Sequence, residues 1–236
     1  MSTFTTTAPL AKILKTIIGA AGRDSTLPML QTVHAARVGD DTLRLTTTDR
    51  FLLARIDVRG EWVSNDTAEV PAEGVMFHID AAKRVGQLFA AGKPSHAHVG
   101  TGITTHLTFD EGQARVEVVG TRAHDGVHTF DLATDFEFPK VDGIIRSIPA
   151  DADRSTGVRL NPTFLKTATT IAGLCERPHT AELYQTGDTR KPIAMHGLLG
   201  SDGDQGEVLV YLMTVRTPEG AGIDPAAIAE RMTGER

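Results

Sequence analysis

The stretch LRLTTTDRFLLARIDV, residues 43–58, sets a pattern that much of the chain repeats. Apolar and polar residues alternate over Leu43–Thr46 and again over Leu53–Val58, which is typical of two half-buried strands. The residues between such runs are turn formers, so the pattern predicts short strands joined by hairpin turns. Further alternating runs occupy 106–109 and 114–119, and further turns are predicted at 39–41 and 110–112.

Other stretches show helical spacing instead. Apolar residues recur every three or four positions over Pro9–Ala21, and Pro9 suits the first turn of a helix. A second helix is expected after the capping residue Asp80 and runs through Phe89. A third is expected after Asn161-Pro162, a cap followed by a proline at the first helical position. A short helix over Pro225–Met232 is also expected.

These elements recur as one unit. A strand, a helix and further strands follow one another in the first 70 residues, again from Val75 to Phe130, and a third time from Gly157 to Val215. The pattern predicts three β-α-β-β-β-like copies of about 60–70 residues each. Such units can pair sheet edge to sheet edge with their helices on one face, so the predicted class is α+β. The prolines and mixed charges of residues 138–153 predict a linker.

Composition restricts the class of protein. The chain has 236 residues, of which 40% are apolar and 23% are charged, and this suits one or two compact soluble domains. We expect no membrane span and no secretory leader, and the single cysteine, Cys175, suits a reducing cytoplasm. The net charge of −6 argues against a protein that binds nucleic acid over its whole surface. Any contact with DNA must therefore come from a local basic face.

The predicted helices offer such a face. Between Pro9 and Gly22 there are basic residues but no acidic ones, and the helix after Asp80 has the same bias. On an acidic body this bias would let one surface hold duplex phosphates without sequence preference. Ordinary solvated helix faces are the alternative interpretation. The candidate DNA-binding residues are Lys12, Lys15, Arg23, Lys83, Arg84, Lys93 and Lys166.

Several segments in combination resemble a known family. Residues 21–30, AGRDSTLPML, followed by 43–54, LRLTTTDRFLLA, resemble the bacterial DNA polymerase III beta sliding clamp, most closely the middle domain of actinobacterial clamps. Phe136–Lys140 resembles the turn that ends that domain. Residues 160–165 and 210–216 resemble the start and the end of the second half of the clamp's last domain. The resemblance extends over nearly the whole chain.

The resemblance implies a ring-shaped, non-catalytic processivity factor that has the sliding-clamp fold and encircles double-stranded DNA. It also implies a clamp loader, a homo-oligomer, no cofactor and no membrane partner. DNA polymerase and other partners would dock through clamp-binding peptides, and a mainly apolar groove suits a short peptide with Leu or Phe side chains. Carried over by motif, the groove would be formed by Leu30, Thr48, Arg50, Phe51, Leu52, Leu53, Pro139, Ile144, Asn161, Phe164, Tyr211, Leu212 and Met213. Plain core packing is the alternative for Leu30, Leu53 and Leu212.

Two departures from the family pattern have consequences. The family usually has arginine where Leu52 stands, so a more apolar peptide preference is expected. The chain is also shorter than a clamp subunit. Residues 1–150 would form one complete clamp-type domain, 151–217 half of another, and 218–236 a tail with a short helix. About four chains would then be needed to close a ring of about twelve units, unless the lone unit pairs with a counterpart or the tail covers an open edge.

Three functions remain open on sequence grounds. The first is a processivity clamp in replication or repair, compact because it comes from a phage or another mobile element. The second is a clamp-like adaptor or decoy that captures clamp-binding peptides without encircling DNA. The third is a metal enzyme, but its candidate histidines lack the spacing of a zinc site. Those histidines are His96, His98, His106, His124 and His128.

Overall fold

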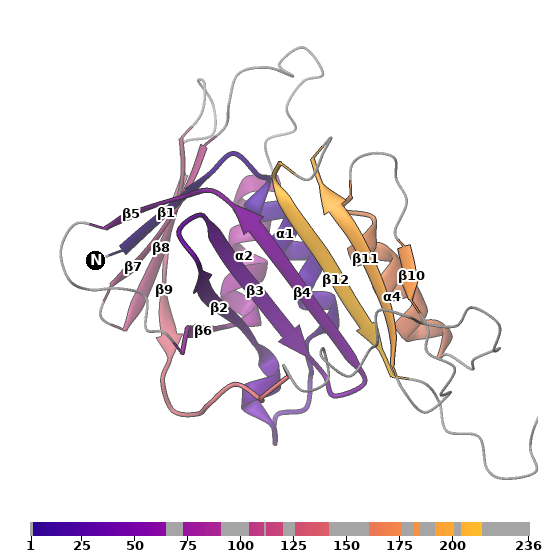
Figure 1. The fold of residues 1–236 in the computed structure, drawn as a ribbon. Coiled ribbons are helices and arrows are strands. Elements are labelled where there is room, and N and C mark those ends of the chain that lie inside the picture. Colours follow the sequence, from indigo (N-terminus) through magenta and orange to yellow (C-terminus); the bar gives the residue numbers. More distant parts are fainter. Residues whose placement is uncertain are drawn as a thin grey trace, which may run out of the picture.

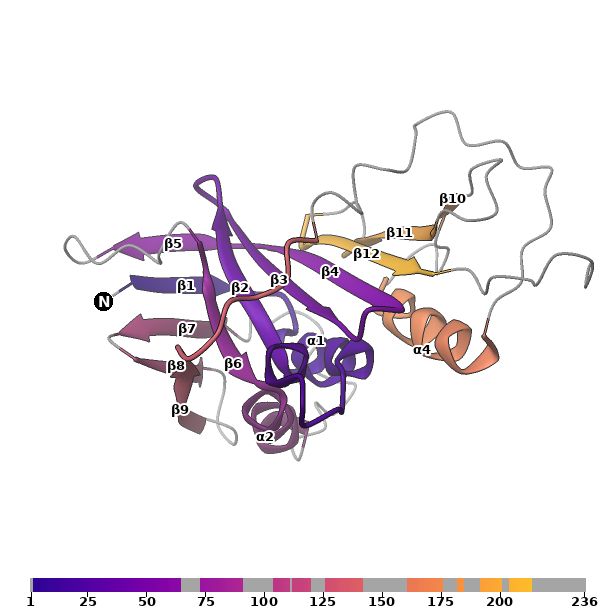
Figure 2. The same cartoon turned by 90° about the horizontal axis from the view of Figure 1, so that it is seen from below.

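The computed structural model describes residues 2–64, 73–90, 104–110, 112–119, 126–141, 161–175, 182–184, 192–200 and 204–213. Within these ranges the helices lie against one face of a large antiparallel sheet (Figure 1, Figure 2). The predicted α+β class is therefore confirmed. The helix predicted at Pro225–Met232, most of the predicted linker and the proposed domain boundaries near 150 and 217 lie outside the described residues.

The elements follow the repeating order that the sequence predicts. The first copy contains β1 (Ser2–Thr6), α1 (Leu10–Ile17), the short 3-10 helices η1 (Ile18–Ala20) and η2 (Pro28–Gln31), β2 (Thr32–Val38), β3 (Thr42–Thr48) and β4 (Leu52–Arg59), followed by β5 (Glu61–Ser64). The second contains β6 (Val75–His78), α2 (Ile79–Ala90), β7 (Thr104–Asp110), β8 (Gln113–Val119) and β9 (Gly126–Ala133). The third contains α4 (Pro162–Ala172), β10 (Glu182–Tyr184), β11 (Ile193–Leu199) and β12 (Gly206–Leu212). The strand predicted before α4 lies outside the described residues.

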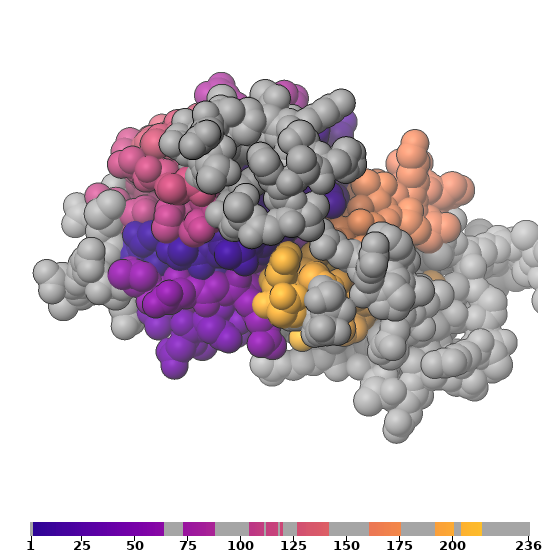
Figure 3. All heavy atoms as spheres, turned by 90° about the horizontal axis from the view of Figure 1, so that it is seen from above, coloured from indigo at the N-terminus to yellow at the C-terminus, as the bar shows by residue number. Residues whose placement is uncertain are grey.

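The described strands form one 12-stranded sheet in the order β10-β11-β12-β4-β3-β2-β6-β9-β8-β7-β1-β5. The third copy joins the first through antiparallel pairing of β12 with β4, where Tyr211 lies opposite Leu53 and Leu212 opposite Leu52. In the space-filling view, the yellow atoms of β12 abut the indigo and purple N-terminal region (Figure 3). This pairing brings residues far apart in sequence to the turn between β3 and β4.

The core lies between the helices and the sheet, because each amphipathic helix turns its apolar residues toward the strands. Alternate residues of β4, from Leu52 to Val58, point into this core. Leu53 points to the opposite face of the sheet and belongs to a separate, smaller cluster. The apolar face predicted for the first helix is confirmed, since Leu10, Ile13, Leu14 and Ile17 are all 0% exposed.

Helices α1 and α2 approach each other closely at Gly86. A Cβ atom at this position would lie 2.7 Å from the Cβ of Lys15 and 3.3 Å from the carbonyl oxygen of Ala11. Any side chain at 86 would therefore push the helices apart. The lack of a side chain at Gly86 thus allows α1 and α2 to pack closely against each other.

The second helix begins at Ile79, two residues earlier than predicted. Strand β6 runs directly into α2, so Asp80 lies inside the first turn and is not the cap. The backbone N–H of Asp80 donates to the imidazole Nδ1 of His78 at 3.2 Å. The prediction that Asp80 caps the helix is wrong, because no loop separates the strand from the helix. An acidic residue in the first turn still interacts favourably with the helix dipole.

The start of α4 agrees with its prediction. The side-chain carbonyl of Asn161 accepts a hydrogen bond from the backbone N–H of Thr163 at 2.9 Å, and Pro162 takes the first helical position. After the helix, Cys175 is 4% exposed, and burial raises the pKa of its thiol above the ordinary value. This environment suits a small buried hydrophobe and disfavours a nucleophilic thiolate.

Candidate peptide-binding pocket

The turn between β3 and β4 forms one wall of a pocket on the sheet face. The hydroxyl of Thr48 accepts a hydrogen bond from the N–H of Arg50 at 3.1 Å and donates one to the carbonyl oxygen of Leu52 at 2.9 Å. The carboxylate of Asp49 accepts hydrogen bonds from the N–H groups of Phe51 and Leu52, at 2.9 and 2.6 Å. Together these bonds hold Arg50 at a φ of 82°, which is uncommon for a residue with a side chain. The turn therefore fixes the positions of Arg50 and Phe51.

The floor of the pocket comes from β4 and β12. Leu53 and Tyr211 face each other across the antiparallel pair and are 4% and 5% exposed. They belong to the same small apolar cluster as Val141. Burial raises the pKa of the Tyr211 phenol above its ordinary value, so its hydroxyl stays protonated at neutral pH. The floor is thus apolar, with one neutral hydroxyl.

Two other segments complete the walls. Leu30 comes from η2, and residues 139–141 follow β9 and cross the outer face of the sheet (Figure 2). The ring of Phe138, just before this segment, stacks on His34 with ring centroids 5.0 Å apart. Met213 is held next to the β3–β4 turn, because its backbone N–H donates a hydrogen bond to the carbonyl oxygen of Phe51 at 2.8 Å. The walls therefore depend on contacts between elements that are distant in sequence.

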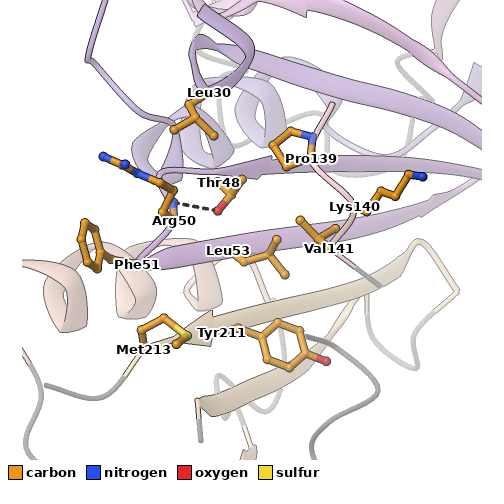
Figure 4. Close-up of a pocket in the computed structure, with 10 residues that line it drawn as sticks. All are labelled: Leu30, Thr48, Arg50, Phe51, Leu53, Pro139, Lys140, Val141, Tyr211 and Met213. Carbon is orange, nitrogen blue, oxygen red and sulfur yellow. Dashed lines mark hydrogen bonds between the residues drawn. The ribbon is translucent and has the colours of Figure 1, made fainter. Parts of the chain in front are cut away.

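The pocket measures about 170 Å³. Small-molecule sites usually occupy roughly 300–1,000 Å³, so this cavity suits the side chains of a peptide better than a whole metabolite. Figure 4 shows the lining residues, with Arg50 and Lys140 at opposite ends and apolar side chains between them. The lining residues are Leu30, Thr48, Arg50, Phe51, Leu53, Pro139, Lys140, Val141, Tyr211 and Met213.

Most of the groove residues carried over from the resemblance meet in this pocket, but Leu52 and Leu212 do not. Both are 1% exposed and belong to the main core beneath the helices. The reason is the period of two along a strand, which turns each of them away from its pocket-lining neighbour. The residues that come together are Leu30, Thr48, Arg50, Phe51, Leu53, Pro139, Tyr211 and Met213.

Two further predicted groove residues, Asn161 and Phe164, are not among the lining residues. Asn161 uses its side chain to cap α4, as described above. The ring of Phe164 stacks on Phe51, with centroids 5.8 Å apart and planes 13° from parallel. Because Phe51 is 52% exposed, this pair extends an aromatic surface beyond the pocket. Ile144 lies outside the described residues.

Sequence reasoning missed two lining residues, Lys140 and Val141. It identified Pro139 but placed the next wall residue at Ile144. No short-range signal marks these two residues, because their position depends on the path that the segment after β9 takes across the sheet. Val141 is 7% exposed and packs with the floor, whereas Lys140 remains exposed at the end of the pocket.

The candidate DNA-binding residues of the helices lie on the other side of the sheet. Helices α1, α2 and α4 all cover the face opposite the pocket (Figure 2). Helices α1 and α4 contain no acidic residue, and α2 contains Asp80 alone. The basic residues concerned take no part in the ion pairs found among the described residues. The exposed ones on these helices are Lys12, Lys15, Lys83, Arg84 and Lys166.

The two remaining basic candidates differ in position. Arg23 is exposed, but it follows η1 and belongs to no helix. Close to it, Asp24 accepts hydrogen bonds from the side chain and backbone of Thr26, and these lower the pKa of its carboxyl. Lys93 lies outside the described residues. The structure therefore gathers five of the seven candidates on the helix face.

Among the residues that the structure describes, the histidines proposed for a metal site do not cluster. His106 is hydrogen-bonded through Nδ1 to the hydroxyl of Thr5 at 2.9 Å. His128 lies against Phe130, with ring centroids 5.8 Å apart. Among the described residues, no three His, Cys, Asp or Glu side chains come close enough to hold a metal ion. His96, His98 and His124 lie outside those residues.

No protein-family model and no curated protein matches the chain. Solved structures do match it. The DNA polymerase III beta subunit of Thermotoga maritima superposes with a TM-score of 0.61 at 16% identity, over 92% of this chain and 66% of that one. The sliding clamp of Bartonella birtlesii, solved with griselimycin bound, gives 0.59 at 16% identity over 91% and 66%. The polymerase III beta protein of Caulobacter crescentus gives 0.60 at 15% identity over 92% and 66%.

These similarities establish the fold as that of a DNA sliding clamp. The matching structures are bacterial DNA polymerase III beta subunits, so the fold implied by the resemblance is confirmed. The chain spans slightly less than two thirds of their length. Within the described residues, no helix has the length and apolar character needed to cross a membrane.

Proposed function

We propose that this protein is a non-catalytic clamp of the DNA polymerase III beta type. It would tether a polymerase and other replication or repair proteins to DNA through peptides bound in the pocket. The observation that carries the proposal is the apolar floor formed where β12 pairs with β4, enclosed by the 48–52 turn and the 139–141 segment. A peptide tail with apolar side chains can bury them there while its polar backbone remains at the rim.

The helix face supports the second part of the proposal. Five exposed basic residues on three helices face away from the pocket, so DNA and peptide would be held on opposite sides. The contact with DNA would be non-specific, through phosphates, and would leave the acidic remainder of the surface free. A clamp loader and self-assembly into a homo-oligomer belong to the same proposal.

Peptide binding can be tested with a fluorescently labelled peptide that carries two leucines and a phenylalanine. Met213→Glu places a carboxylate in the apolar pocket, and we expect it to weaken binding by about tenfold or more. Leu198→Glu is the matched control, because Leu198 is 41% exposed on a neighbouring strand and lies outside the pocket lining. Fluorescence anisotropy measures both affinities. Equal losses in the two variants, or no binding to the unmodified protein, would contradict the proposal.

The second candidate function is a clamp-like adaptor or decoy that binds the same peptides without encircling DNA. The observation that favours it is the position of the pocket, which lies across the sheet from α1, α2 and α4 and is lined by none of their residues. An adaptor needs the pocket but not the basic helix face. Retention on circular DNA separates the two functions.

A further inference from the structure

The charged side chains that line the pocket are both cationic. Arg50 and Lys140 are the ionisable side chains at its ends, and no carboxylate is among the lining residues (Figure 4). The chain as a whole carries a net charge of −6, so a cationic pocket is the opposite of the average surface. Local charge of this kind determines which partners approach and which are repelled.

Arg50 is held in place at a conformational cost. Its φ of 82° is a conformation that glycine adopts readily and that residues with a Cβ adopt at the cost of strain. The hydroxyl of Thr48 and the carboxylate of Asp49 accept hydrogen bonds from backbone N–H groups of the turn, and these bonds hold it in this form. The turn therefore presents a guanidinium group at a position where glycine would fit with less strain.

The Arg50 side chain is open to a ligand. It is exposed, and it makes no ion pair with any of the described residues. Its guanidinium carbon lies 5.9 Å from the centroid of the Phe51 ring, which in turn stacks on Phe164. The carboxyl of Asp24 interacts electrostatically with Arg50, but it accepts its hydrogen bonds from the backbone N–H and the hydroxyl of Thr26. Lys140, at the other end, is likewise exposed and without an ion pair among the described residues.

We propose that the pocket selects acidic tails, in which Asp or Glu side chains flank the apolar residues that bind the floor. Arg50 would bind one carboxylate through its planar fork of donors, and Lys140 would bind another as a point charge. Charge complementarity identifies this occupant, since two cations flank an apolar floor and no lining acid opposes them. The inference rests on the proposed peptide-binding function and adds the chemistry of the partner.

The test uses three synthetic peptides with the same leucine and phenylalanine core. The first has glutamates on both sides and an amidated C-terminus. The second has glutamines in their place and the same amide. The third has glutamines and a free C-terminal carboxylate. We expect the unmodified protein to bind the first roughly tenfold tighter than the second at low salt, with a smaller ratio as added salt screens the charges.

The protein variants identify the residues responsible. In the double variant Arg50→Gly, Lys140→Gln the affinity ratio between the first and second peptides should fall to about one, because no pocket cation remains. Arg50→Gly should fold, since glycine adopts a positive φ freely, and circular dichroism checks this. Arg115→Gln is the matched control, because Arg115 is an exposed strand cation outside the pocket lining, and it should keep the full ratio.

Each outcome separates this inference from the proposed function. Equal affinity for glutamate and glutamine peptides would overturn acidic selection and leave peptide binding intact. A preference for the free C-terminal carboxylate over the flanking glutamates would overturn the assignment to acidic side chains. An unchanged ratio in the double variant would overturn the roles of Arg50 and Lys140. Failure of all three peptides to bind would instead overturn the proposed function, and the inference with it.

Discussion

Leu52 and Leu53 are adjacent in the sequence, but their side chains lie on opposite faces of β4. Leu53 forms part of the pocket floor, while Leu52 is packed under the helices with residues such as Leu212. The resemblance assigns both to the peptide groove and treats Leu52 as the position of a polar anchor. At the scale of the residue, the pleat of the strand decides the role of each.

This placement changes the expected effect of an arginine at position 52. Leu52→Arg would bury an unpaired charge in the core and should lower the free energy of unfolding by about 3–5 kcal/mol. Chemical denaturation followed by circular dichroism measures the change. Phe51→Arg is the control, because Phe51 is half exposed and loses only its stacking on Phe164, so it should lower the free energy of unfolding much less than Leu52→Arg. A stable Leu52→Arg protein with tighter peptide binding would instead place residue 52 in the pocket.

At the scale of the element, the start of α4 agrees with the prediction from the local sequence. Asn161 was expected both to start the helix and to line the groove. The structure uses its side chain for the first task, since its carbonyl oxygen accepts the N–H of Thr163. The helix also carries Phe164, whose ring extends the aromatic surface next to Phe51. The cap therefore supports the pocket by fixing where α4 begins.

Removing the cap gives a prediction at this scale. Asn161→Ala leaves the N–H of Thr163 without its acceptor and should lower the free energy of unfolding by about 1 kcal/mol. Asn161→Asp keeps an acceptor at the same position and should retain most of the stability. Thermal unfolding compares the two variants. A loss of peptide affinity in both variants, without loss of stability, would favour direct contact between residue 161 and the peptide.

At the scale of the whole molecule, the sheet separates the two surfaces for which we propose peptide binding and DNA binding. The pocket lies on one face and the basic helices on the other. The close contact of α1 with α2 at Gly86 brings their exposed lysines and arginine together. An acidic protein can thus present a group of exposed basic side chains on its helix face.

Charge reversal on the helix face tests the proposed contact with DNA. Replacing Lys12, Lys15, Lys83, Arg84 and Lys166 by glutamate should abolish retention on circular duplex DNA, because the phosphate contacts become repulsive. Peptide affinity should stay the same, since the pocket lies across the sheet. Gel filtration of the protein with nicked circular DNA measures retention after loading. Retention that survives the reversal would exclude these helices as the DNA-binding surface.

Assembly gives a second prediction at this scale. The described sheet ends in the strands β5 and β10, and an edge strand offers unpaired backbone groups to another chain. We expect native mass to rise with concentration to that of a homo-oligomer, with about four chains for a closed ring. Native mass spectrometry across a concentration series measures this. A monomer at every concentration would contradict a self-assembled ring and favour the adaptor.

Local patterns in the sequence predict the individual elements, because these signals are short in range. The alternation in 43–58 fixed two strands, the spacing from Leu10 to Ile17 fixed the buried face of α1, and Asn161-Pro162 fixed the start of α4. The turn motif around Thr48 to Leu53 also pointed to the correct region for the pocket. None of these depends on residues far away in the chain.

Which side chains meet depends on contacts between distant parts of the chain. The pairing of β12 with β4 places Tyr211 opposite Leu53 and sends Leu52 and Leu212 into the core. The path of the segment after β9 brings Lys140 and Val141 to the pocket, and no local pattern marks either residue for that position. Strand register and the course of a connecting segment depend on the packing of distant elements, and short-range patterns do not encode them.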